Sequence, residues 1–373
     1  MTYEAYRAAI LDVAYLAACA VNDTVPDAAR VGTMDLENLY KAADRHLLTG
    51  ITAMALESAG IKRDAFTQAK GKAIRKVTVF DVERVTILEK LEEAGIWYMP
   101  LKGSVLKSLY PKTGMRQMAD NDILCDASRM SDVRIIMENL GFSADSAFGR
   151  SIHDHYFKPP VCNFEMHRAL FGSGHDQRMT EYYQEVKSRL ILNEGSRYGY
   201  HFREEDFYIY LLAHEYKHYS NSGTGLRSVL DTYVYLKKKG DTLDWTYLSE
   251  EVDKLGIADF EAQNRSLALH LFGGEELTVQ DQEMLEYLLS SGTYGTVQNR
   301  VKNRIRKYGN GPFRKQRYVM SRLFLPMNTV RAAFPLFIKC PILLPFLPVY
   351  RVARGMRLRK DRLRAEWKEL RKQ

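Results

Sequence analysis

The chain has 373 residues, of which 46% are hydrophobic and 27% charged, and this composition excludes intrinsic disorder over most of its length. Four cysteines without a CxxC spacing argue against a disulfide framework and a thiolate zinc site, and they favour a reducing, cytoplasmic compartment. The net charge of +8 is uneven: residues 300–373 contain 21 Lys and Arg against 3 Asp and Glu, whereas residues 1–299 contain 33 against 43. We therefore expect an acidic body with a basic tail, in about two or three domains.

Residues 1–94 are expected to form a helical N-terminal segment. Apolar side chains recur at helical spacing over residues 39–47 and again through Val82, Val85 and Leu91. The apolar stretch AILDVAYLAACAV is interrupted by an aspartate and lacks a basic lead, so it predicts a buried helix rather than a secretory signal.

Residues 95–195 are expected to form a small mixed sheet with helices. The run IWYMPLK predicts a short strand, after which Gly103 marks a tight turn into a helix. Three later runs have the composition or alternation of strands: NDILC (121–125), HDHYFK (153–158) and VCNFEMH (161–167). A helix starting at Ser128 or Ser131 should follow the first of these.

A helical domain is expected at residues 196–295, and a basic tail at residues 296–373. The tail contains FPLFIKCPILLPFLPVY (334–350), in which Lys339 and four prolines oppose a transmembrane helix. We expect this segment to lie on the body as an extended apolar strap, with a basic helix after it. The positive charge of the tail could bind nucleic acid, an anionic membrane surface or the acidic body.

Three acidic residues form the main candidate site. Side chains alternate along a strand, so Asp120 and Asp122 project from one face, and Glu165 joins them if its strand pairs with theirs. Clustered carboxylates repel each other, and relief of this repulsion predicts that Asn at either aspartate raises stability. A hard cation explains the cluster, because Mg²⁺ takes oxygen ligands and bridges them to substrate phosphates.

The turn before these acids has the features of a phosphate site. Gly103 and Ser104 stand between a strand and a helix, where glycine permits close approach and free backbone N–H groups can bind a triphosphate. Lys102 and Arg116 supply the positive charge that a pyrophosphate leaving group requires. Together with the acids, this order of residues indicates phosphoryl-transfer chemistry.

The ordered motifs LKGSVL, DND and NFEMH resemble the DNA polymerase β-like nucleotidyltransferase superfamily. Its pattern is hG[GS] at a strand-to-helix turn, [DE]h[DE] on the next strand and one acid on a later strand. More narrowly, LKG…L…LY…R…D.D.L, then HR.L, then LLAHEYKH…LRSVLD look like the bacterial uncharacterised nucleotidyltransferase family, over roughly residues 36–350. Asn121 departs from the pattern, because the superfamily usually has an apolar residue between the two acids.

The resemblance implies an α+β fold with a polymerase β-like core, and transfer of a nucleoside monophosphate from an NTP to an acceptor hydroxyl. By this resemblance, Asp120 and Asp122 would bind two Mg²⁺ ions, and Glu165 would bind the catalytic ion and help to activate the acceptor. Gly103 and Ser104 would hold the β- and γ-phosphates. The family does not determine the acceptor or the base.

The segment HEYKH offers a different interpretation, because His214 and His218 could bind zinc on one helical face with Glu215 as a base. Asn221 and Thr224 occupy the positions where a metzincin has glycine and histidine, so a zinc peptidase is the weaker alternative. We expect both histidines to be interior polar residues that contact the substrate.

Three further histidines are candidate site residues, and a non-catalytic protein is an alternative to an enzyme. His153 and His155 share a strand face, but no third ligand is near them in sequence, so they are interpreted as substrate contacts or surface residues. His167 is a further candidate substrate contact. A non-catalytic nucleotide or nucleic-acid binding module of the same fold remains an alternative, which the presence of all three acids disfavours.

Overall fold

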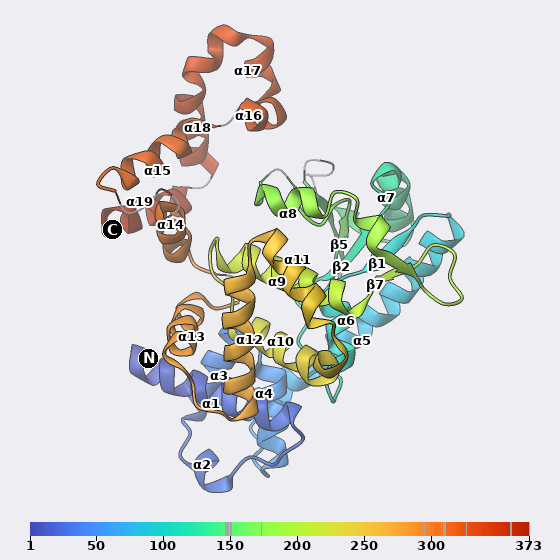
Figure 1. The fold of residues 1–373 in the computed structure, drawn as a ribbon, viewed down its shortest axis with the longest axis vertical. Helices are drawn as coiled ribbons and strands as arrows, with labels where there is room; N and C mark the ends of the chain where they lie inside the picture. Colours follow the sequence, from blue (N-terminus) through green and yellow to red (C-terminus); the bar gives the residue numbers. More distant parts are fainter. Residues whose placement is uncertain are drawn as a thin grey trace. The chain divides into compact units, whose positions relative to one another are not determined.

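The computed structural model describes residues 1–145, 149, 151–172, 174–293, 295–306, 308, 311–325, 327–358 and 360–372. The chain divides into two units, which Figure 1 shows as a ribbon. The main unit comprises residues 1–217 and 225–289, and the C-terminal unit comprises residues 218–224 and 290–373.

The helices of the main unit, two of which end in the other unit, are α1 (Tyr3–Val21), α2 (Ala28–Gly32), α3 (Leu36–Arg45), α4 (Thr49–Ser58), α5 (Asp64–Glu93), α6 (Gly103–Leu106), α7 (Met130–Asn139), α8 (Gln177–Tyr182), α9 (Glu204–Tyr219), α10 (Leu226–Lys239), α11 (Trp245–Leu255), α12 (Ala258–Gly273) and α13 (Val279–Ser291). Its strands are β1 (Tyr98–Pro100), β2 (Asn121–Cys125), β3 (Ser143–Ala144), β4 (His153–Lys158), β5 (Cys162–His167), β6 (Leu190–Leu192) and β7 (Tyr200–Phe202).

The N-terminal helices pack against helices from much later in the chain. Helix α1 contacts α3, α4 and α12, and α12 in turn contacts α10 (Figure 1). A buried histidine, His46, joins these parts: its Nε2 lies 2.7 Å from the Tyr6 hydroxyl, and the Leu226 backbone N–H donates to its Nδ1 over 2.9 Å. Burial lowers the pKa of His46 to about 3, so the ring is neutral and serves as a structural link.

Residues 64–93 form helix α5, as expected, but the face that α5 buries is not the one through Val82 and Val85. Val82 and Val85 are 64% and 54% exposed, so the predicted stripe is wrong at these two residues, although its third member, Leu91, is buried. The residues that α5 buries against the sheet are Val77, Phe80, Ile87 and Leu91. Two residues along a helix turn a side chain by about 200°, so Val82 lies opposite Phe80, and contact with the sheet selects the stripe of Phe80.

The five-stranded sheet has the order β1-β2-β5-β4-β3. Strand β2 runs parallel to β5, with Asp122 opposite Glu165, and the other neighbouring pairs are antiparallel. The side chains that pack under α5 and α7 on one face include Ile123, Cys125, Tyr156, Phe164 and Met166. Alternation sends the intervening residues to the other face. The expected α+β class with a small mixed sheet is confirmed.

The C-terminal unit contains α14 (Val297–Arg306), α15 (Arg314–Leu323), α16 (Met327–Ala333), α17 (Pro335–Lys339), α18 (Leu347–Leu358) and α19 (Lys360–Lys372). The expected extended strap at residues 334–350 is wrong, because this segment forms α17, a 3-10 helix and the start of α18. Pro335 and Pro341 lie in first turns, where a missing N–H costs nothing. Among the described residues, no helix has the length and apolar character needed to cross a bilayer.

Candidate active site

The turn after β1 brings Lys102 to the polar face of the sheet. Lys102 has φ +46°, in the left-handed region that favours glycine, and such a conformation costs about 1–3 kcal/mol unless the surroundings hold it. Its ammonium donates to Asp122 Oδ1 over 2.8 Å, and the Leu101 N–H donates to the Asp122 carbonyl over 3.0 Å. Strand β2 therefore holds the turn that the sequence predicts as a phosphate site.

Gly103 and Ser104 begin α6, which is four residues long. A Cβ on Gly103 would overlap the guanidinium of Arg116, so any other residue here would have to displace that group. The Ser104 hydroxyl donates to the Leu101 carbonyl over 2.7 Å and retains only its acceptor capacity for a ligand.

Asp122 is buried and accepts two contacts at one oxygen. Lys102 Nζ and His167 Nε2 each lie 2.8 Å from its Oδ1. Burial opposes ionisation, but the Lys102 ammonium and the bond with His167 prevail and hold the pKa of Asp122 well below its usual range. Asp122 is therefore a carboxylate whose charge is matched by Lys102.

Asp120 differs from Asp122 in having no partner. Among the described residues it has no hydrogen bond or ion pair, although it directly precedes β2. Burial, followed by the charges of Asp122 and Glu165, raises the pKa of Asp120 above its usual value. Among the described residues, Asp120 is thus a half-buried carboxylate without a partner, and its charge is available to a hard divalent cation.

Glu165 lies opposite Asp122 and among three histidines. Glu165 Oε2 is 3.5 Å from His167 Nε2 and 3.7 Å from His153 Nε2, and its Oε1 is 3.4 Å from His155 Nδ1. Burial opposes ionisation of Glu165, yet the contact with His167 lowers its pKa overall. Burial, with a smaller effect of His167, lowers the pKa of His153 to about 4, so that this ring is neutral at pH 7.

Arg116 is buried in a pair that the sequence did not predict. Its Nε and NH2 donate to the two oxygens of Asp231 on α10 over 2.7 and 2.8 Å, and the Tyr110 hydroxyl donates to the same carboxylate over 2.8 Å. This bidentate pair links the sheet to the helical part of the unit. The Asp231 carboxylate is thus occupied by Arg116 and Tyr110.

Comparison with known proteins adds one finding to this geometry. Residues 32–273 match the family model described as uncharacterised nucleotidyltransferase. The chain belongs to this family. No curated protein and no solved structure matches it. The predicted family is confirmed, and membership supports a nucleotidyltransferase that acts on a nucleotide substrate.

Two cationic side chains of this nucleotidyltransferase, Lys217 and Arg227, lie near the acids and were not predicted from the sequence as site residues. Burial, and then repulsion from Lys102, lowers the pKa of Lys217 on α9 to about 8. Arg227 on α10 donates through NH1 to the Gln117 carbonyl over 2.8 Å, and burial followed by Arg116 lowers its pKa. Among the described residues neither has a carboxylate within ion-pair distance. The segments HEYKH and LRSVLD contain these two residues, so the signal was present in the motifs themselves.

The HEYKH segment does not have the geometry of a zinc peptidase. Glu215 is buried against α12, where it accepts a hydrogen bond from Asn264 Nδ2 over 3.1 Å, and burial followed by Asp231 raises its pKa well above the usual value. The ring of His214 packs on Tyr210. Among the described residues, the group of three side chains with metal-binding geometry is instead His153, Glu165 and His167.

Proposed function

We propose that the protein transfers a nucleoside monophosphate from an NTP to an acceptor hydroxyl, with release of pyrophosphate. The observation that carries this proposal is the strand register that sets Glu165 beside Asp122, with the unpaired Asp120 adjacent. Asp120, Asp122 and Glu165 would hold two Mg²⁺ ions. Bound Mg²⁺ supplies Lewis-acid stabilisation of charge on the transferring phosphoryl group.

The residues of the chain have separate tasks in this proposal. The acceptor oxygen bonds to the α-phosphorus as the bond from that phosphorus to the bridging oxygen breaks, and the electron pair leaves with pyrophosphate. Lys217 and Arg227 face the charge of the leaving group, because within the described part of the chain no carboxylate is paired with either of them. Glu165 orients the acceptor hydroxyl for attack and accepts its proton. Lys102 holds Asp122 in its ionised form.

Transfer of label from an α-labelled NTP tests this function. Purified protein, Mg²⁺ and a cell extract should yield a labelled acceptor, and the variant Asp120→Asn should not label it. A wild-type protein that binds NTP equally with and without Mg²⁺, and labels nothing, would contradict the proposal and support the non-catalytic binding module.

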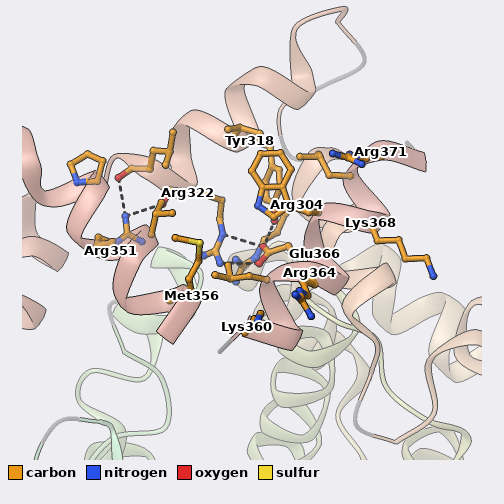
Figure 2. Close-up of a pocket in the computed structure, with 18 of the residues that line it drawn as sticks. Arg304, Tyr318, Arg322, Arg351, Met356, Lys360, Arg364, Glu366, Lys368 and Arg371 are labelled. Atoms are coloured by element: carbon orange, nitrogen blue, oxygen red, sulfur yellow. Dashed lines mark hydrogen bonds and ion pairs between the residues drawn. The ribbon is translucent and has the colours of Figure 1, made fainter. Parts of the chain in front are cut away.

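We propose that the C-terminal unit contacts an anionic membrane surface. Figure 2 shows a pocket of about 1110 Å³ within this unit. Its cationic lining residues are Arg304, Arg322, Arg351, Lys360, Arg364, Lys368, Arg371 and Lys372. The acidic residue of the lining, Glu366, is already bonded to Tyr318 and Arg322. The excess charge fits the phosphate of a headgroup.

Exposed apolar side chains favour a membrane over nucleic acid as this partner. Leu336, Ile342, Phe346 and Val349 are 63–83% exposed on the elements that precede and begin α18. A lipid surface accommodates both apolar side chains and cations, whereas phosphate contacts to nucleic acid would leave the apolar groups in water. Vesicles of phosphatidylglycerol should bind the full chain and vesicles of phosphatidylcholine should not, and Ile342→Ser should weaken binding. Salt-sensitive binding to RNA without vesicle binding would contradict this proposal.

A further inference from the structure

We propose that His153, Glu165 and His167 form a binding site for a divalent transition-metal ion such as Mn²⁺ or Zn²⁺. The sequence showed two histidines on one strand face, His153 and His155, and no third ligand near them. The fold supplies the missing ligands from the neighbouring strand. The catalytic meaning of this site rests on the proposed function, but metal binding can be measured without turnover.

Strand pairing explains why these residues meet. His153 on β4 stands opposite His167 on β5, and Glu165 is two residues from His167, so all three project from one face of the sheet. Both Nε2 atoms point at the same carboxylate oxygen, Glu165 Oε2. The rings of His153 and His167 are 4.8 Å apart between centroids. Two adjacent strands therefore present three donor atoms to a single point.

The spacing of the donor atoms suits an ion at their centre. Nitrogen and oxygen ligands lie about 2.0–2.2 Å from such an ion, which places neighbouring ligand atoms about 2.9–3.6 Å apart. Glu165 Oε2 is 3.5 Å from His167 Nε2 and 3.7 Å from His153 Nε2, and all three donor atoms lie within 4.8 Å of one another.

The donor types select the class of metal. Imidazole nitrogen suits Zn²⁺ or Fe²⁺ and a carboxylate also suits Mn²⁺, whereas Mg²⁺ prefers an octahedron of oxygens. Two histidines with one carboxylate are also the protein ligands of known catalytic zinc sites. Asp122 Oδ1 lies 2.8 Å from His167 Nε2, and an ion bound at this nitrogen would replace that hydrogen bond. The site thus adjoins the oxygen-rich pair Asp120 and Asp122 and shares Glu165 with it.

Calorimetric titration of the full-length, chelator-treated protein with Zn²⁺ and with Mn²⁺, in excess Mg²⁺, tests the proposal. We expect one ion per chain, and a loss of affinity of about tenfold or more in His153→Ala. His201→Ala is the matched control, because His201 is an exposed histidine on β7. Unchanged affinity in a folded His153→Ala protein would overturn the site. Loss of binding in His214→Ala, with His153→Ala unaffected, would place the metal at HEYKH and also overturn it.

X-ray absorption of the zinc-loaded wild-type protein gives a second readout that needs no variant. The proposal expects imidazole scattering from about two nitrogen ligands, and its absence would contradict the proposal. Imidazole ligation in a protein that transfers no nucleotide would disprove the proposed reaction and leave the metal site standing. If the His153→Ala variant transferred nucleotide with Mg²⁺ and bound the transition metal as tightly as the wild type, the metal site would be disproved and the proposed reaction would stand.

Discussion

The two faces of the five-stranded sheet are built from alternate residues of the same strands, but one face is an apolar core and the other carries charged and histidine side chains. On one face Ile123, Phe164 and Met166 lie in a continuous apolar core under α5 and α7. On the other, one residue away along each strand, Asp122, Glu165 and His167 gather charge and ring nitrogens. The comparison shows that substitutions on one face should change stability, and substitutions on the other should change chemistry.

The largest expected effect is on catalysis, and it separates the two aspartates. Asp120→Asn and Asp122→Asn should each lower transfer by about a thousandfold or more, because each removes a cation ligand. Their effects on stability should be opposite. Asp122→Asn leaves Lys102 buried without its partner and should lower the melting temperature, whereas Asp120→Asn removes an unpaired charge and should raise it.

Thermal unfolding in metal-free buffer measures this difference. The sequence predicted that both variants gain stability, and the ion pair of Asp122 with Lys102 is the reason to expect otherwise for that residue. Equal shifts in both variants would contradict the division of roles between the two acids. The depressed pKa of Asp122 also means that its contribution to stability is present at neutral pH and is lost as pH falls.

Phe164→Ala tests the apolar face. Phe164 is fully buried and packs against Phe80 and Phe142. Truncation should cost about 3–5 kcal/mol in the free energy of unfolding, through lost transfer energy and a residual cavity. Urea unfolding measures the change, with Phe157→Ala, a 48% exposed phenylalanine on β4, as the matched control. A loss below about 1 kcal/mol would refute the role of this face as core.

Lys217→Gln should weaken binding of the NTP by about tenfold, seen as a higher KM with little change in kcat. Because its pKa is about 8, wild-type Lys217 loses its charge as pH rises through that value, and NTP affinity should fall with it. The variant should lack this fall. Lys238→Gln, at an exposed lysine of α10, is the control. If NTP affinity fell with rising pH in Lys217→Gln as it does in the wild type, Lys217 would not be the source of that fall.

The smallest expected effect is a gain in stability from Asn121→Val. Asn121 is fully buried on the apolar face of β2, and within the described residues neither its Oδ1 nor its Nδ2 has a hydrogen-bond partner. Valine would remove this desolvation cost and suits a buried strand, for a gain of about 1–2 kcal/mol. Urea unfolding of the wild type and the variant, with equal m-values, measures this change in the free energy of unfolding. Destabilisation would show that Asn121 has a polar partner, such as an ordered water.

Local chemistry made much of the main unit predictable. Side chains alternate along any strand, and the apolar content of NDILC and the alternation of VCNFEMH depend on a few adjacent residues, so both strands follow from the sequence. The same alternation puts Asp122 and Glu165 on the polar face before any pairing is known. The contact face of α5 was not predictable in this way, because Val82 and Phe80 are equally apolar and only the position of the sheet distinguishes them.

By itself the sequence determined the fold class and the family, and it predicted the three acids as the site, since these depend on the order and spacing of residues along one chain. Only the tertiary structure decided which charges are paired. Lys102 with Asp122 and Arg116 with Asp231 are separated by 20 and 115 residues. Lys217 and Arg227 have no such carboxylate partner among the residues that the structure describes. It also brought His153 to Glu165 and His167, because strand register is set by side-chain packing across the whole sheet.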